Sequence, residues 1–220
     1  GLKLGEIASQ NPQLDGVVLQ GHGLFTWGET SKACYETTIE IIQIASDYLQ
    51  SIGDVFSPAQ ENLFDGDERA RIAMALMPAI RGKISANERK VGHFIDSAVV
   101  LDFVNSGELR RLAAIGTSCP DHFLRTKIRP LVLDAGAGAT DAAATIDAII
   151  QSLDATLESY RADYIAYYER CRNDQSPAIR DANAVVYLIP KVGMITFARD
   201  KATARIAGEF YVNAINVMRG

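Results

Sequence analysis

The stretch VVYLIPKVGMITFARD, residues 185–200, decides the fold of this 220-residue chain. It contains two short runs of β-branched, aromatic and other apolar residues, 185–189 and 193–198, with a tight bend between them. We therefore predict two consecutive strands. Asp200 is placed to cap a following helix, which carries Ala202, Ile206, Phe210, Ala214 and Val217.

The start of the chain repeats this pattern. Residues 17–19 and 24–27 are β-prone runs around Gly21-His22-Gly23, and Thr30 is a candidate cap for a helix that reaches about Ser51. GLFTWG (23–28) aligns with GMITFA (193–198) at an offset of 170 without a gap, so we infer a duplicated unit. The first helix is predicted to face inward with a regularly spaced set of residues: Tyr35, Ile39, Ile42, Ala45 and Leu49.

Between the two copies the periodicity changes several times. We predict a linker at 52–66 and a loop of small residues at 134–144. Helices are predicted at 67–80 and 108–115, and 90–104 contains a mixture of strand-like runs. The helix at 67–80 should bury Ile72, Ala75, Leu76 and Ile80. A long helix is predicted from about Thr140 to Arg172, and its apolar stripe is typical of packing or of a subunit interface: Ile146, Ile149, Ile150, Leu153, Leu157, Tyr160, Tyr164 and Tyr168.

Composition excludes several classes of function. The net charge of -5 offers no basic surface for nucleic acid or an anionic membrane, and no apolar run is long enough to cross a bilayer. The glycines of DAGAGATDAAA (134–144) lack the strand–turn–helix setting of a phosphate-binding loop. The three cysteines, Cys34, Cys119 and Cys171, indicate neither a disulfide framework nor a zinc motif, and this pattern favours a reducing cytoplasm. We expect Cys34 and Cys171 to be small buried side chains.

His22 is the candidate metal ligand. Its flanking glycines permit a sharp turn and leave the imidazole accessible, but zinc needs three or four protein ligands. The other histidines, His93 and His122, stand in unlike contexts and form no H-x-H or H-E-x-x-H motif. From the residues alone, a turn histidine bonded to the backbone remains the alternative.

The segment GHGLFTWGETSKACYETTI (21–39) resembles the class II aldolase/adducin family, most closely the bifunctional rhamnulose-1-phosphate aldolase/short-chain dehydrogenase proteins. This resemblance implies an α/β, three-layer fold with a mixed or mostly antiparallel sheet covered by helices. It also implies that His22 is the third histidine of a divalent metal site, usually zinc, whose H-x-H pair lies upstream of this sequence. In the family the metal acts as a Lewis acid on a ketose-phosphate carbonyl.

The second copy departs from the family at the metal-binding position. Val192 stands where the third ligand would be, and valine cannot bind metal. GTSCPDHF (116–123) resembles the family's H-x-H-P-D segment with Thr117 and Cys119 in place of histidines; a substitute site from Cys119 and His122 is the less favoured alternative. We therefore predict residues 1–56 to be the end of a first aldolase-like unit and 57–220 to be a second, degenerate unit.

These observations lead to two expectations about function. The chain is interpreted as an inactive fragment of a bifunctional protein that cleaves a deoxyketose 1-phosphate and whose missing short-chain dehydrogenase domain uses NAD. The alternative is a non-catalytic module for oligomerisation or linkage in such an oxidoreductase; a free-standing small-molecule binding domain is a third reading. No catalytic or cofactor-binding residue is assigned. Because the first strand pair should leave apolar surface, we expect a homo-oligomer.

Overall fold

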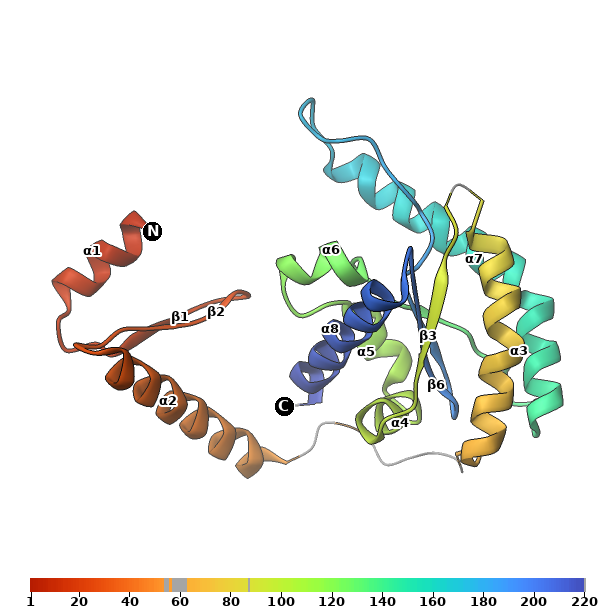
Figure 1. Ribbon diagram of the computed structural model, residues 1–220, viewed down its shortest axis with the longest axis horizontal. Helices are drawn as coiled ribbons and strands as arrows, with labels where there is room; N and C mark the ends of the chain where they lie inside the picture. The colour runs from red at the N-terminus through yellow and green to blue at the C-terminus, as the bar shows by residue number, and fades with distance from the viewer. Residues whose placement is uncertain (54–55, 57–62, 87, 220) are drawn as a thin grey trace. The chain divides into compact units, whose positions relative to one another are not determined.

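A computed structural model describes residues 1–53, 56, 63–86 and 88–219 (Figure 1). The chain divides into two compact units, Gly1–Asp54 (unit 1) and Val55–Arg219 (unit 2), which are treated separately below. Most of the linker predicted at 52–66 lies outside the described residues, so the boundary at 56/57 stays a prediction. In the described part of the chain, no helix has the length and apolarity needed to cross a membrane.

Unit 2 is built on a four-stranded sheet in the order β3-β6-β5-β4. The strands are β3 (Val91–Ile95), β4 (Leu131–Val132), β5 (Val186–Ile189) and β6 (Gly193–Ala198). The predicted strand pair is present, since β5 and β6 form an antiparallel hairpin. β3 adds antiparallel to β6, and β4 adds parallel to β5, so the sheet is mixed and mostly antiparallel. This confirms the expected α/β class.

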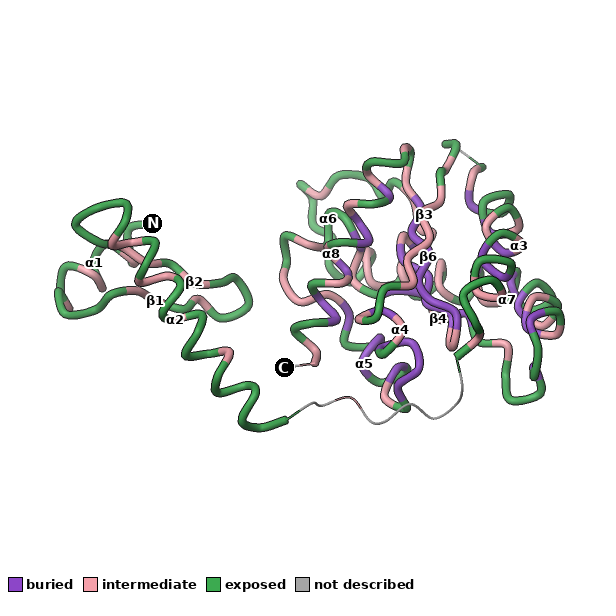
Figure 2. Tube along the Cα trace, turned by 60° about the horizontal axis from the view of Figure 1, so that its bottom comes forward, coloured by how far each residue is buried: buried purple, intermediate pink, exposed green. Residues whose placement is uncertain are grey.

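Helices cover both faces of this sheet, and Figure 2 shows the buried residues gathered along it. Because side chains alternate along a strand, β5 sends Tyr187 and Ile189 into one apolar core and Val186 and Leu188 into the other. The first core is closed by α3 (Gly66–Ile84) and α7 (Ala142–Cys171). The second is closed by α4 (Ala98–Val104), α5 (Leu109–Ile115) and α8 (Lys201–Arg219). The short elements η1 (Pro120–His122) and α6 (Phe123–Thr126) lie between α5 and β4 in the chain.

Aspartates begin the three long helices of unit 2. The carboxylate of Asp65 accepts a hydrogen bond from the backbone N–H of Glu68, whose side chain completes a capping box. Asp141 accepts from the N–H of Ala144 at 2.9 Å. Asp200 accepts from the N–H of Thr203 at 2.7 Å, which confirms the cap predicted for α8. Each bond satisfies a donor that the helix itself leaves unpaired.

One prediction about unit 2 is wrong in detail, and the buried face of α8 was not predicted. The run AVVLDFV is not a strand but helix α4, because Val100, Phe103 and Val104 recur at helical spacing and are buried together. Of the five residues that the sequence analysis names on this helix, only Ala214 is buried; Ala202 and Val217 are exposed. The buried face contains small residues that let the helix approach the sheet, together with Tyr211 and Ile215: Ala204, Ala207, Gly208 and Ala214.

Unit 1 consists of α1 (Leu2–Gln10), the hairpin β1 (Gly16–Leu19) and β2 (Gly23–Thr26), and α2 (Ser31–Ile52). None of its described residues reaches the buried class. The stripe predicted to face inward on α2 is exposed throughout, which corrects that assignment: Tyr35, Ile39, Ile42, Ala45 and Leu49. α2 meets the hairpin through Cys34, Thr38 and Ile41 instead.

The two hairpin–helix segments correspond residue by residue at an offset of 170. Gly16↔Thr26 in unit 1 matches Val186↔Thr196 in unit 2, and the register agrees at the three following pairs as well. The Trp27 N–H bonds to the Asp15 carbonyl, as that of Phe197 does to Val185. Equal offset, register and backbone bonding support the duplication inferred from sequence.

Candidate functional site

The bend that presents His22 is set by backbone geometry. Gly21 and Gly23 adopt positive φ angles of 68° and 146°, which favour glycine. The N–H of His22 donates to the Leu19 carbonyl at 3.0 Å and closes the turn. The His22 side chain is exposed, and its ring stacks on Phe25 with centroids 6.1 Å apart. The imidazole therefore contacts Phe25 on one side and is otherwise accessible.

The corresponding bend of unit 2 has the same geometry without the ligand. Lys191 and Gly193 have φ angles of 64° and 144°, and the N–H of Val192 donates to the Ile189 carbonyl at 3.1 Å. Val192 is fully buried in the apolar core. This bend thus has a structural role and no donor atom for a metal.

The other two histidines, His93 and His122, belong to unit 2. His93 on β3 lies 2.9 Å, through Nδ1, from Lys201 Nζ, and burial together with the charges of Lys201 and Arg205 lowers its pKa. His122 contacts Phe210 edge-on and approaches Ser118 Oγ at 3.3 Å. Among the described residues, no three His, Cys, Asp or Glu side chains are grouped to hold a metal ion. The described residues thus offer His22 no such group of donors.

The segment 116–123 and the bend at Lys191–Gly193 have different neighbours. His122 packs against Phe210 of α8. Pro190 and Lys191 instead line a small cavity of about 40 Å³ together with Asp134 and Gly136 of the loop that follows β4. The substitute site from Cys119 and His122 also gains no third donor within the described residues. Of the cysteines, Cys34 and Cys119 are half-buried and Cys171 is exposed, so the prediction that Cys171 is buried is wrong.

The tyrosines of α7 line a cleft that sequence reasoning did not identify. Ile149, Leu153 and Leu157 enter the core as predicted, but Ile150 is 44% exposed and lies outside it. Beyond Leu157, α7 lines a cleft of about 730 Å³. The cleft residues include Arg129, Tyr160, Asp163, Tyr164, Tyr167 and Arg170. The Tyr160 hydroxyl donates to the Arg129 carbonyl at 2.8 Å and joins the two walls. The cleft has the size of a small-molecule site.

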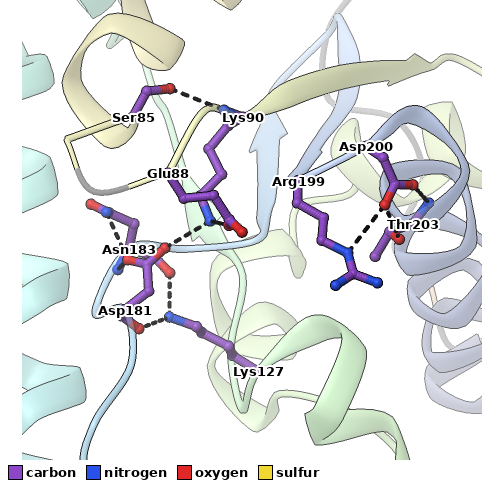
Figure 3. A network of polar contacts seen from close by, with 9 residues as sticks. All are labelled: Ser85, Glu88, Lys90, Lys127, Asp181, Asn183, Arg199, Asp200 and Thr203. Carbon is purple, nitrogen blue, oxygen red and sulfur yellow. Dashed lines mark hydrogen bonds and ion pairs between the residues drawn. The ribbon is translucent and has the colours of Figure 1, made fainter.

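A half-buried cluster of charged residues adjoins this cleft at Tyr164, and Figure 3 shows the cluster. Lys127 Nζ donates to the carbonyls of Asp181 and Asn183 and lies 4.2 Å from the centre of the Tyr164 ring. Burial lowers the pKa of Lys127 to about 8, which the charge of Asp181 only partly offsets. Lys90 Nζ lies 3.2 Å from the Asp181 carboxylate.

The pKa shifts of Lys90 and Asp181 follow from the ion pair between them. Burial disfavours the charge on Lys90, but its bonds to Glu88 and Asp181 outweigh that effect and raise the pKa. For Asp181, burial is outweighed by the hydrogen bond from the Asn183 N–H and by both lysines, so the pKa falls. The cluster ties distant segments together. It contains no sequence motif, and nothing in the spacing of residues 90, 127 and 181 could have predicted it.

Comparison with known proteins places the chain in a family. Residues 71–220 match the family described as "Aldolase class II, second domain". The chain is also 34% identical to the uncharacterized oxidoreductase YuxG of Bacillus subtilis (strain 168), over 99% of the chain but 31% of that protein. It therefore spans about a third of the length of this relative. No solved structure matches. With the aldolase-type match extending over most of its length, the chain belongs to the class II aldolase family, as a second domain.

Proposed function

We propose that this chain is part of a metal-dependent sugar-phosphate aldolase fused to a short-chain dehydrogenase. The whole protein would cleave a deoxyketose 1-phosphate such as rhamnulose 1-phosphate, and its dehydrogenase part would use NAD. His22 would supply one ligand of the divalent metal, zinc, while unit 2 is a degenerate aldolase-like unit without catalytic residues. The protein would work in the cytoplasm as a homo-oligomer, without nucleic-acid or membrane partners.

The observation that carries this proposal is the contrast between the two bends. His22 presents an accessible imidazole, whereas Val192 in the same backbone position is buried and inert. The described residues alone give the metal one donor instead of three, so this chain by itself is proposed to be inactive.

Zinc titration of the 220-residue chain tests this division of roles. We expect no tight stoichiometric binding, and the same result for His22→Ala. One tightly bound zinc per chain would overturn the proposal that the site is incomplete. In a longer protein that contains the chain, His22→Ala should remove bound zinc and retro-aldol activity together, while His122→Ala retains both.

A second candidate is a non-catalytic module for oligomerisation or linkage in an oxidoreductase. Two observations favour it: the relative's name is that of an oxidoreductase, and no three-donor cluster exists in the described chain. The longer protein distinguishes the two candidates. If the chain is a non-catalytic module, the longer protein would show no retro-aldol activity. His22→Ala would then change neither the metal content nor the oxidoreductase rate of that protein.

A further inference from the structure

The hairpin of unit 1 forms a two-stranded sheet, and within the described chain both of its outer edges are unpaired. Since the Trp27 N–H points to β1, strand alternation directs the N–H groups of Leu24 and Thr26 to the outer edge of β2. Such an edge is a template for another strand, and a hairpin alone is only marginally stable in water.

The repeat within the chain shows what belongs on these edges. In unit 2, β3 lies antiparallel along 194–198 of β6, which corresponds to 24–28 in unit 1. β4 lies parallel to β5 at Tyr187 and Leu188, which correspond to Val17 and Val18. By this correspondence, unit 1 lacks one antiparallel strand next to β2 and one parallel strand next to β1.

The side chains indicate missing cover on both faces of the hairpin. Val18 is 71% exposed, whereas its counterpart Leu188 is fully buried. On the opposite face Phe25 is 42% exposed, and its counterpart Ile195 is fully buried. Ile44 of α2 is likewise exposed, whereas its counterpart Ala214 of α8 is buried against α4 and α5. In unit 2, helices from 66–115 and from α7 supply this cover.

We propose that the hairpin β1–β2 is the docking surface for a polypeptide segment folded like residues 66–133, supplied by a longer protein of this family. This segment adds a strand antiparallel to β2 along 24–28 and a second strand parallel to β1, and its helices cover Val18, Ile44 and Phe25. The proposal does not depend on metal binding by His22.

The need for two differently oriented strands favours such a segment over a second copy of the chain. Two copies related by a two-fold axis can pair β2 with β2 antiparallel, but the edge of β1 and the face around Val18 then stay open. A parallel strand requires a long crossover connection, which a segment with its own helices provides. YuxG of B. subtilis, of which the matched part is 31%, has enough chain to contain one.

Hydrogen exchange followed by mass spectrometry tests the proposal on two proteins. In the 220-residue chain we expect the peptide covering 23–28 to exchange at least about 100-fold faster than the matched peptide 193–198. In full-length YuxG, the peptides aligned with these two should be protected to a similar degree. Fast exchange of the first peptide in YuxG as well would overturn the proposal. Protection of 23–28 in the 220-residue chain that appears only as its concentration is raised would identify a second copy as the occupant, and would also overturn it.

A matched pair of variants gives an independent measurement. Val18→Asp in the 220-residue chain should leave the unfolding midpoint unchanged, whereas Leu188→Asp should lower it strongly or prevent folding. The change aligned with Val18→Asp in full-length YuxG should then be as damaging as the one aligned with Leu188→Asp. If it remains harmless there, no segment covers this face and the proposal fails.

Discussion

His22 and Val192 occupy the same position in two bends of equal register, 170 residues apart, but His22 is exposed and Val192 is fully buried. The backbone of the two bends is alike, including positive φ at the residue before each: Gly21 in one and Lys191 in the other. The difference therefore lies in what surrounds the bend. One copy keeps a donor atom accessible, and the other uses the position for packing.

Exchanging the two side chains should have unequal effects on stability. Val192→His places an imidazole in an apolar core without a partner, which we expect to lower the free energy of unfolding of unit 2 by about 2–3 kcal/mol. His22→Val changes an exposed side chain and should cost less than about 0.5 kcal/mol. Urea unfolding followed by circular dichroism measures both, and equal effects would contradict the assigned environments.

Thr196 anchors α8 to the sheet. Its hydroxyl is fully buried and donates to the Ala204 carbonyl at 2.7 Å. Thr196→Val should therefore lower the free energy of unfolding by about 1–2 kcal/mol. In unit 1 the matching bond, from Thr26 to Cys34, is 3.4 Å long and half-buried, so Thr26→Val should cost less. A larger loss for Thr26→Val would argue against the correspondence of the two units.

The hydroxyl of Tyr211 has no hydrogen-bond partner among the described residues, although the side chain is buried. Burial raises its pKa. Tyr211→Phe removes a desolvated polar group and should leave stability unchanged or raise it by up to about 1 kcal/mol. Tyr160→Phe is the control, because it loses the bond to the Arg129 carbonyl and should cost about 1 kcal/mol. A thermal melt in which Tyr211→Phe is clearly the less stable of the two would disprove this reasoning.

Lys127 should make the stability of unit 2 depend on alkaline pH. Its pKa is lowered from 10.5 to about 8 by burial, so between these values the unfolded chain binds the proton and the folded chain does not. The free energy of unfolding therefore rises with pH in this window, and below pH 8 the cost of burying the charge is constant. Compared with Lys127→Met, the unmodified chain should gain up to about 2 kcal/mol between pH 8 and 10. Denaturant unfolding of both proteins at several pH values tests this, and a flat or falling difference would refute it.

Local signals predicted much of the fold. The strand pair 185–198, its counterpart at 17–27 and the helices at 67–80, 108–115 and 140–172 are all present. Alternating apolar runs, bends and capping residues are properties of neighbouring residues, so a single sequence contains them. The bend that presents His22 is of the same kind.

Which face of each helix is buried could not be predicted in this way. On α2 the regularly spaced apolar residues suggested the buried stripe, yet the smaller residues Cys34 and Thr38 face the hairpin. Their counterparts Ala204 and Gly208 are buried on α8 in unit 2. A Cβ on Gly208 would come within 2.3 Å of Ile95, a residue 113 positions away. Close approach between helix and sheet depends on that distant partner, and periodicity gives no information about it.

The sequence by itself thus determined the repeated strand–bend–strand–helix unit, the presence of His22 in one copy and its loss in the other. Only the tertiary structure decided that AVVLDFV is a helix, that Val192 is core, and that Lys127, Asp181 and Lys90 form one cluster beside a cleft. The physical reason is the range of the interactions. Bends and caps form between residues a few positions apart, whereas burial and charge pairing arise between segments that only folding brings together.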